Sequence, residues 1–315
     1  MWKGARDYQP ASPMNNKSSG FGASSDERDR LPLPISSTVD VDLFALSHQG
    51  HVRKRNEDHY LVVHGGRYLE TVFSNVSENQ PGYRFEETAY AMIIAHGVGG
   101  EPSVEVASQE AIINLLELAL RTPDWQFRWG QKEKNTVMWR MQDRFRQVNA
   151  ALLQRSDRNV SLSGMSTTMT AALTHGRDLV IGHVGDSRAY LLRQGKLARL
   201  TRDHTLAEQL LNEGEDIKND NLLKALGNVL MQALGGSQSD FRPDVTHFTL
   251  EDKDQLLLCT DGLTEMVDDF LITSILADAE SAQSACRKLV ELALVGGGRD
   301  NVTVVVARYS IPESN

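Results

Sequence analysis

The sequence has few cysteines, too little basic charge and no long apolar run, and each shortage excludes a class of protein. Its 315 residues include two cysteines, Cys259 and Cys286, which cannot build a disulfide framework and lie too far apart for a zinc knuckle. Lys and Arg number 33 against 42 Asp and Glu, so the formal net charge is −9. The basic surface that nucleic-acid backbones require is therefore missing, and we predict no nucleic-acid partner.

No apolar run reaches the roughly 18 to 20 residues that span a bilayer, and residues 1–10 do not resemble a signal peptide. We therefore expect a soluble cytoplasmic protein with no membrane partner. Residues 1–38 are rich in Ser, Asn, Asp, Gly and Pro and have few branched or aromatic side chains. Such a segment cannot bury enough apolar area to offset the entropy of ordering. We predict a disordered tail over 1–38 and a folded domain over 39–310.

Short apolar segments bounded by Gly, Asp or Asn predict strands, and longer segments with apolar residues three or four apart predict helices. Strands are expected over 41–46, 59–63, 90–95, 169–174, 179–184, 189–193, 255–259 and 303–307. Helices are expected over 103–121, 137–154 and 282–294. The order of strands, a helix pair, more strands and a further helix favours a layered α+β fold or a sandwich over strict βαβ alternation.

Acidic residues stand where predicted strands begin or end. Five carboxylates have this placement: Glu57, Asp58, Asp186, Asp261 and Asp300. Carboxylates gathered at one edge of a sheet repel one another unless a cation neutralises them. An all-oxygen cluster selects Mg²⁺ or Mn²⁺, and two such ions form a centre that hydrolyses phosphate esters. Arg53, four residues before Glu57, adds a guanidinium that can bind an anion.

An apolar strand also leads into the glycine-rich turn His96-Gly97-Val98-Gly99-Gly100. Glycines there allow positive φ and let backbone groups come close to a ligand. A dinucleotide-binding loop is the competing interpretation, but the G-x-G-x-x-G pattern needs a third glycine where this sequence has Pro102. A nucleotide-binding protein is therefore the third-ranked class.

Seven segments, taken in order, carry the pattern of a known family. They are Gly50-His51-Val52-Arg53 leading to Asn56-Glu57-Asp58, His96-Gly97-Val98-Gly99-Gly100, Gly164-Met165-Ser166-Thr167-Thr168, Gly185-Asp186-Ser187-Arg188, Leu200-Thr201-Arg202-Asp203-His204-Thr205, Thr260-Asp261-Gly262-Leu263 and Arg299-Asp300-Asn301. In these segments the chain resembles the metal-dependent protein serine/threonine phosphatases of type 2C, the PPM family. The resemblance covers residues 39 to about 309.

The resemblance implies a four-layer αββα fold, in which a central sandwich of two antiparallel sheets is flanked by helices on both sides. It also implies phosphoserine and phosphothreonine substrates in proteins, and a binuclear Mn²⁺ or Mg²⁺ centre at one end of the sandwich. Arg53 would hold the substrate phosphate. The metal ligands would be Glu57, Asp58, the residue at position 96, Gly97 through its carbonyl, Asp261 and Asp300, with Asp186 at a third, weaker site. A cognate serine/threonine kinase is an expected partner, and a monomer is favoured.

One position departs from the family pattern. The turn Asp-Gly-x-Gly-Gly begins here with His96, where relatives have the Asp that bridges both metals, so His96 is expected in a catalytic and metal-binding role. A neutral imidazole offers one nitrogen lone pair, and none once it is protonated near pH 6.5. Three interpretations follow: a slow or metal-shifted phosphatase in which His96 binds one ion; a pseudophosphatase that binds phosphoproteins or a partner without turnover; or an active enzyme whose natural residue has been replaced deliberately.

Two further stretches are singled out by comparison with the family. Residues 67–88 are longer than the hairpin of compact relatives, and an exposed hairpin without function is favoured over an insertion for partner recognition. Residues 205–235 correspond to the flap that shapes substrate access in relatives.

Overall fold

The computed structural model describes residues 39–70, 72, 84–99, 103–121, 131–215, 217–236 and 241–311. The chain divides into two units, Met1–Ile35 and Ser36–Asn315. The first unit and the tail expected over residues 1–38 lie outside the described residues, as do residues 73–83 of the stretch 67–88. The disorder of the tail and the domain boundary at residue 39 stay predictions.

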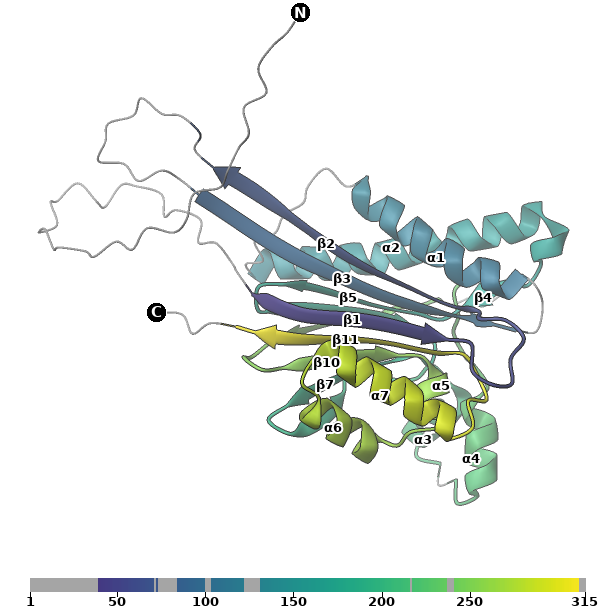
Figure 1. The fold of residues 1–315 in the computed structure, drawn as a ribbon. Coiled ribbons are helices and arrows are strands. Elements are labelled where there is room, and N and C mark those ends of the chain that lie inside the picture. Colours follow the sequence, from purple (N-terminus) through teal and green to yellow (C-terminus); the bar gives the residue numbers. More distant parts are fainter. Residues whose placement is uncertain are drawn as a thin grey trace, which may run out of the picture. The chain divides into compact units, whose positions relative to one another are not determined.

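Two antiparallel sheets lie face to face in the second unit (Figure 1). One sheet has the order β1 (Asp40–His48), β11 (Val302–Ser310), β10 (Gln255–Cys259), β7 (Arg188–Arg193) and β8 (Lys196–Arg199). The other has the order β2 (Asp58–Glu70), β3 (Arg84–Val98), β5 (Met169–His175), β6 (Asp178–Val184) and β9 (Asp244–Thr249). The short β4 (Ser166–Thr167) pairs with the end of β3.

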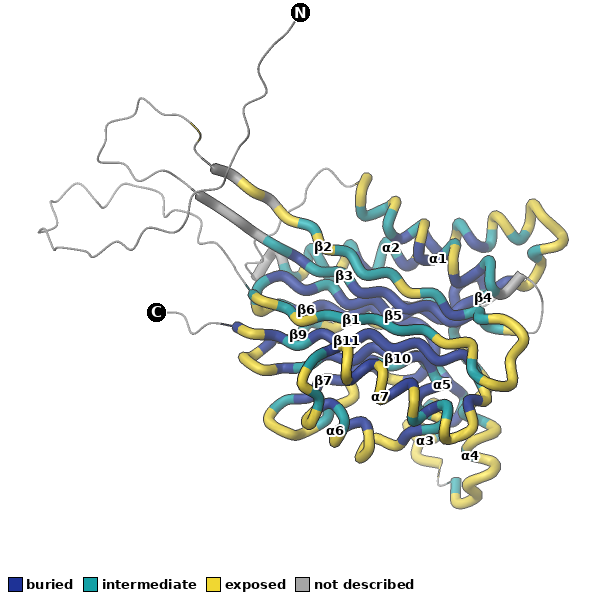
Figure 2. Tube along the Cα trace, viewed as in Figure 1, coloured by how far each residue is buried: buried dark blue, intermediate teal, exposed yellow. Residues whose placement is uncertain are grey.

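The alternation of side chains along each strand explains why the sheets stack. In β10, Leu256 and Leu258 join the apolar cluster between the sheets, together with Met92 and Ile94 of β3. Leu257, between them, belongs to the cluster on the outer face of its sheet. Successive side chains of a strand point to opposite faces, so a continuous apolar run serves two cores at once. Figure 2 shows the resulting buried strands in the middle of the fold.

Helices cover the outer face of each sheet. α1 (Ser103–Leu120) and α2 (Gln131–Arg158) share an apolar cluster with β3, β5 and β6. α6 (Asp269–Asp278) and α7 (Ala282–Val295) share another with β7, β10 and β11. Three apolar clusters therefore separate four layers, and the predicted αββα sandwich is confirmed. None of the described helices is long and apolar enough to cross a membrane.

The strands and helices differ in extent from the sequence prediction. β2 and β3 are longer than expected, because their pairing continues past the apolar residues and joins polar positions such as Gly66 and Thr88. β3 also runs through His96 and Gly97, so the turn expected over 96–100 begins later than predicted. Seven elements were not expected: the 3₁₀ helix Val160–Leu162, β4, α3 (Leu206–Asn212), α4 (Asp220–Gly227), α5 (Asp261–Thr264), α6 and β9.

The segment expected as a flap forms two short helices, α3 (Leu206–Asn212) and α4 (Asp220–Gly227). The side chain of Thr205 caps α3, and that of Asn219 caps α4. Bridges join Thr205 to Leu230 and Thr167 to Leu234, so the segment returns to the sheet at the end of β4. The return connects it to the strand end that carries His96 and Gly97.

Candidate active site

The predicted site residues meet at one end of the sandwich. Arg53 and Glu57 lie in the loop between β1 and β2, and Asp58 begins β2 opposite His96 near the end of β3. The other three carboxylates follow β6, follow β10 and precede β11: Asp186, Asp261 and Asp300. Antiparallel pairing places these strand ends together, because β10 ends beside both the beginning of β7 and the beginning of β11. The sequence prediction of a shared sheet edge thus corresponds to the observed arrangement.

Asp58 and His96 form a buried pair. Their register places them opposite each other, and Nδ1 of His96 donates to Oδ1 of Asp58 at 2.6 Å. The second oxygen of Asp58 accepts hydrogen bonds from the hydroxyls of Thr260, at 2.9 Å, and Thr303, at 2.7 Å. Thr260 follows β10 and Thr303 lies in β11, so this one carboxylate connects the two sheets. Its side chain is 0% exposed.

The backbone of His96 is bonded as firmly as its ring. The carbonyl of His96 accepts from the amide of Thr168, at 2.9 Å, and from the hydroxyl of Thr167, at 2.8 Å. The hydroxyl of Thr168 in turn bonds that of Ser187 at 2.9 Å, which extends the network to the turn that contains Asp186. Backbone and ring bonds together leave the imidazole little freedom to turn.

Three side chains offer ligand atoms to one point. His96, Asp261 and Asp300 each place a nitrogen or carboxylate oxygen within 4.8 Å of the others. Asp261 begins α5, and its Oδ1 is buried without a hydrogen-bond partner. Asp300 accepts from the amide of Asn301 through Oδ1, at 2.8 Å, and forms an ion pair with Arg53 through Oδ2. A buried carboxylate oxygen with no donor is the kind of atom that a cation would satisfy.

The electrostatics of the cluster also favour the binding of a cation. Burial raises the pKa of Asp261, and the charges of Asp300 and Asp58 raise it further. Burial, with the charge of Asp261, raises the pKa of Asp186 to about 7. Burial alone would lower the pKa of His96, but the charges of Asp261 and Asp58 outweigh it and raise that pKa well above 6.5. The negative charges of these buried carboxylates therefore destabilise one another, and a bound cation would relieve that repulsion, as is expected of a metal site.

Asn301 holds the loop that carries Arg53 and Glu57. Its side-chain nitrogen donates to the carbonyls of Gln49 and Arg55, each at 2.8 Å, and its oxygen accepts from the amide of Glu57 at 2.8 Å. The residue is fully buried. The loop also needs Gly50, at φ +81°, where a Cβ would lie 2.3 Å from the carbonyl oxygen of Asp300. The hydrogen bonds of Asn301 and the close approach at Gly50 together hold the Arg53 loop next to the turn that contains Asp300.

Replacing Asn301 with Ala is expected to lower the free energy of unfolding by about 3 kcal/mol, because three backbone groups lose their partner. Urea denaturation would measure it. The exposed Asn221 of α4 offers a matched control, since Asn221→Ala removes a solvent-facing amide. Equal stability of the two variants would contradict the role given to Asn301.

Backbone hydrogen bonds position two of the predicted metal residues, Glu57 and Gly97. The carbonyl of Glu57 accepts from Ser108 at 2.7 Å and from the amide of Gly97 at 3.3 Å, which brings both predicted metal residues to the site. No individual role was predicted for Thr260, Asn301 or Thr303. The first two belong to the quoted segments Thr260-Asp261-Gly262 and Arg299-Asp300-Asn301, so their position beside an acidic residue was the available signal.

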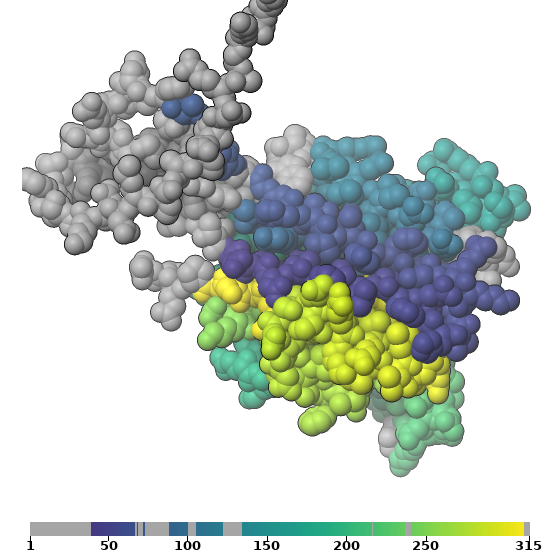
Figure 3. All heavy atoms as spheres, viewed as in Figure 1, coloured from purple at the N-terminus to yellow at the C-terminus, as the bar shows by residue number. Residues whose placement is uncertain are grey.

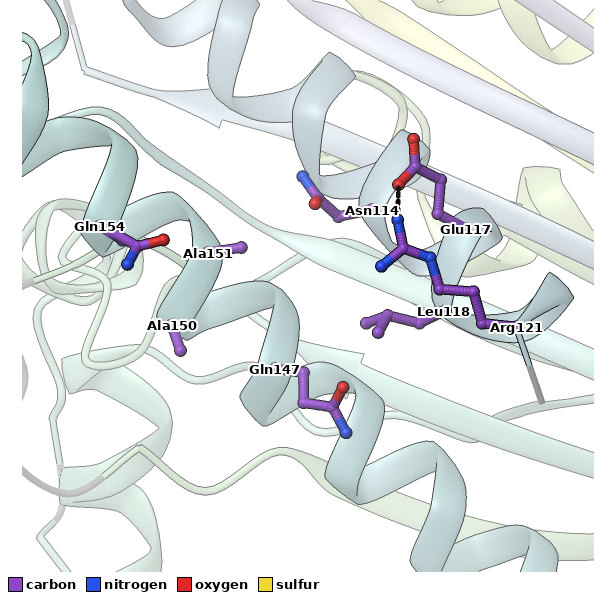
Figure 4. A pocket seen from close by; sticks show the side chains of 8 residues that line it. All are labelled: Asn114, Glu117, Leu118, Arg121, Gln147, Ala150, Ala151 and Gln154. Carbon is purple, nitrogen blue, oxygen red and sulfur yellow. Dashed lines mark hydrogen bonds and ion pairs between the residues drawn. The ribbon is translucent and has the colours of Figure 1, made fainter.

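A separate open groove lies between α1 and α2, and Figure 4 shows its lining. The residues are Asn114, Glu117, Leu118, Arg121, Gln147, Ala150, Ala151 and Gln154. Its two charged groups neutralise each other, since Arg121 donates to Glu117 at 3.1 Å. The groove begins at Asn114, eleven residues and about 16 Å along α1 from Ser103, and it belongs to the outer helical layer.

Comparison with known proteins gives one consistent result. The family model "Protein phosphatase 2C" matches residues 82–292. The chain is 37% identical over 226 residues to the serine/threonine protein phosphatase PstP of Mycobacterium tuberculosis, which covers 70% of this chain and 41% of PstP. It therefore spans less than half the length of that relative. The serine/threonine phosphatase stp of Listeria welshimeri is 32% identical over 268 residues, or 84% of this chain and 94% of the relative.

Solved structures agree with the sequence matches. The crystal structure of the catalytic domain of PstP in complex with two manganese ions has a TM-score of 0.66 and 32% identity, and the match covers 87% of this chain and 100% of that one. A crystal structure of a bacterial serine phosphatase has a TM-score of 0.68 and 25% identity, over 88% of this chain and 100% of the other.

Proposed function

Because the chain belongs to the protein phosphatase 2C (PPM) family of metal-dependent serine/threonine phosphatases, we propose that it hydrolyses phosphoserine and phosphothreonine in proteins at the end of the sandwich described above. The observation that carries the proposal is the convergence of His96, Asp261 and Asp300 on one point beside Arg53. The substrates are phosphorylated proteins, and the kinase that phosphorylates them is the corresponding partner.

The donor atoms of the site fit a divalent cation. Asp261 contributes a buried oxygen without a partner, and His96 and Asp300 contribute a nitrogen and an oxygen within 4.8 Å. A cation held there would stabilise the charge that develops on the transferred phosphoryl group. The predicted Mn²⁺ or Mg²⁺ suits the carboxylate ligands, and the raised pKa and unpartnered buried oxygen of Asp186 support the proposal of a third, weaker site.

Arg53 is the proposed phosphate ligand. Its side chain is 44% exposed although it pairs with Asp300, so part of it remains accessible from solvent beside the acidic cluster. A hydrogen bond to Asp300 raises the pKa of Arg53, which keeps the group cationic at every working pH. A guanidinium binds phosphate oxygens through two parallel hydrogen bonds. Glu57, Asp58 and Gly97 are proposed to support the metal end of the site.

His96 is proposed to lower the activity of this chain below that of relatives with Asp at the same position. An imidazole offers one lone pair and no negative charge, and in this chain one ring nitrogen already bonds Asp58. The same contact favours a second candidate function, in which the chain binds phosphoproteins without turning them over. Activity measurements separate these two.

Hydrolysis of p-nitrophenyl phosphate and of a phosphothreonine peptide with Mn²⁺ tests the proposal. We expect the parent chain to hydrolyse both, and Asp261→Asn to lose about 10²-fold or more, as is usual when one electrostatic element is removed from an active site. Asp157→Asn, at an exposed position on α2, is the matched control and is expected to keep full activity. If Asp261→Asn were as active as the parent, hydrolysis would not arise from this site; an inactive parent with a functional His96→Asp variant would support the second candidate.

A further inference from the structure

We propose that the metal centre of this chain binds one divalent cation instead of two, through Nε2 of His96 and the carboxylates of Asp261 and Asp300, and that it prefers Zn²⁺ or Co²⁺ to Mg²⁺. Asp58 positions the imidazole and does not ligate the ion. The inference rests on the proposed function, since it concerns the same site, but its test counts ions and needs no turnover.

The first step is the state of Asp58. Both of its oxygens are in use: Oδ1 accepts from the ring of His96, and Oδ2 accepts from two threonine hydroxyls. The side chain is fully buried, and it does not belong to the group of three whose ligand atoms converge. Asp300 also accepts two hydrogen bonds, but its ligand atom lies within 4.8 Å of those of His96 and Asp261, whereas Asp58 is not part of this group. Asp58 therefore serves the site through His96.

The second step is the single free nitrogen of His96. The carboxylate of Asp58 can only accept, so Nδ1 of His96 carries a hydrogen in either charge state of the ring, and Nε2 is the one nitrogen that can offer a lone pair once a cation displaces its proton. A carboxylate that receives a hydrogen bond from one ring nitrogen while the other nitrogen binds metal is a recurrent arrangement in metalloproteins. One lone pair binds one ion, so His96 cannot bridge two.

The third step is the shortage of ligands for a second ion. Next to the first ion, the remaining predicted metal residues are Glu57, the carbonyl of Gly97 and Asp186. The backbone amide of Gly97 donates to the carbonyl of Glu57 at 3.3 Å, and the carboxylate of Asp58 accepts from His96, Thr260 and Thr303. A second ion would lack both the bridging ligand and the carboxylate of Asp58. Within the described residues, the only group of three or more His, Cys, Asp or Glu side chains that converges on a point is the one formed by His96, Asp261 and Asp300.

The metal preference follows from the donor set. One imidazole nitrogen with two carboxylates resembles the ligands that hold Zn²⁺ in hydrolases, which use three protein ligands and keep one position open. Mg²⁺ prefers oxygen ligands in near-octahedral geometry, and a nitrogen ligand favours the later transition metals. Replacing the acidic residue of the family pattern with His96 should therefore shift selectivity as well as stoichiometry.

Ion counting tests the inference on the full chain. Metal is removed with a chelator, and the chain is titrated with Zn²⁺, Co²⁺, Mn²⁺ and Mg²⁺ by isothermal calorimetry, with native mass spectrometry to count bound ions. We expect one tightly bound Zn²⁺ or Co²⁺ per chain at the His96 centre, apart from any ion at the weaker site proposed at Asp186, with at least about tenfold higher affinity than for Mg²⁺. His96→Asp is expected to bind two Mn²⁺ and to lose the preference for Zn²⁺. Two Mn²⁺ per chain in the parent, no bound ion, or tighter binding of Mg²⁺ would each overturn the inference.

The role of Asp58 has its own readout. Asp58→Asn is expected to keep one Co²⁺ per chain with about 10- to 100-fold weaker affinity, which is the usual cost of losing such a support. Its visible absorption spectrum per bound Co²⁺ should equal that of the parent, because the ligands are the same. A changed spectrum would show that Asp58 is itself a ligand. The ion count of the unmodified chain decides the main inference even if this variant does not fold.

The outcomes also separate the inference from the proposed function. An active parent that binds two Mn²⁺ overturns the inference and leaves the function intact. A parent that binds one Zn²⁺ at this site, and is inactive together with its His96→Asp variant, overturns the proposed hydrolysis and supports the inference.

Discussion

Exchange of His96 for Asp is expected to raise the turnover of a phosphothreonine peptide in Mn²⁺ by about 10²- to 10³-fold, the range typical of a single electrostatic element in an active site. The physical reason is that a carboxylate supplies a second ligand oxygen and one negative charge where the imidazole supplies a single lone pair. The carboxylate would also free Oδ1 of Asp58 from its bond to Nδ1. Steady-state kinetics over a range of Mn²⁺ concentrations would show higher turnover and tighter metal activation together.

His96→Asn is the matched control for this prediction. Asn has nearly the shape of Asp but no charge, and its side chain has only one oxygen, so it should leave turnover at or below the parent value. Adding Asp261→Asn to the His96→Asp variant should remove the gain, because both residues would contribute to the same centre. If His96→Asp and His96→Asn had the same activity, the account of the bridging position would be wrong.

Acidification is expected to destabilise the fold through His183, which is almost completely buried in β6. Its Nδ1 accepts from the hydroxyl of Thr170 at 2.9 Å, and its Nε2 donates to the carbonyl of Arg202 at 3.1 Å. Burial, together with the ring of His204 4.9 Å away, lowers the pKa of His183 to about 4 against the opposing charges of Asp203 and Asp244. The neutral ring is therefore part of the native structure.

The sign of the effect follows from the two pKa values of His183. In the unfolded chain the imidazole titrates near 6.5, so between pH 6.5 and 4 the unfolded state binds a proton that the folded state does not. The free energy of unfolding is complete above pH 6.5 and falls by about 3 kcal/mol on the way to pH 4, at about 1.4 kcal/mol for each unit of pKa difference. Urea denaturation at pH 7 and at pH 4 measures the loss.

Other groups titrate in the same range, so the contribution of His183 is the difference between variants. His183→Gln should remove about 3 kcal/mol of the pH dependence, whereas His64→Gln, at an exposed position of β2, should not change it. An unchanged pH dependence in His183→Gln would show that the ring already carries a proton in the folded state.

The sandwich was predictable because its strands are apolar on both faces. Residues 256–258 are three leucines and residues 304–307 are three valines and an alanine, and each run contributes to one core between the sheets and one beneath a helix. The gathering of acidic residues was predictable because they stand next to the ends of these strands in the sequence. In an antiparallel sandwich the ends of neighbouring strands meet wherever the chain turns.

The remaining features depend on contacts that a local pattern does not contain. α6 begins where the side chain of Asp268 accepts from the amide of Leu271, a cap that resembles many surface turns. Oδ2 of Asp58 accepts hydrogen bonds from the hydroxyls of Thr260 and Thr303, which lie 202 and 245 positions away along the chain. Its acidic character was visible in the sequence, but the use of both its oxygens was decided by how the two sheets dock. That docking also determines which ring nitrogen of His96 stays free.

The neighbouring positions of β1 and β11 have a consequence for how the protein matures on the ribosome. β1 pairs along its whole length with β11, and Figure 3 shows the purple and yellow segments side by side. The partners of the Arg53 loop and of Asp58 include Asp300, Asn301 and Thr303, which are synthesised 244 to 247 residues later. A nascent chain therefore cannot assemble this end of the sandwich until β11 has left the exit tunnel. Any product of translation that stops before residue 300 would lack Asp300, one of the three side chains whose ligand atoms converge.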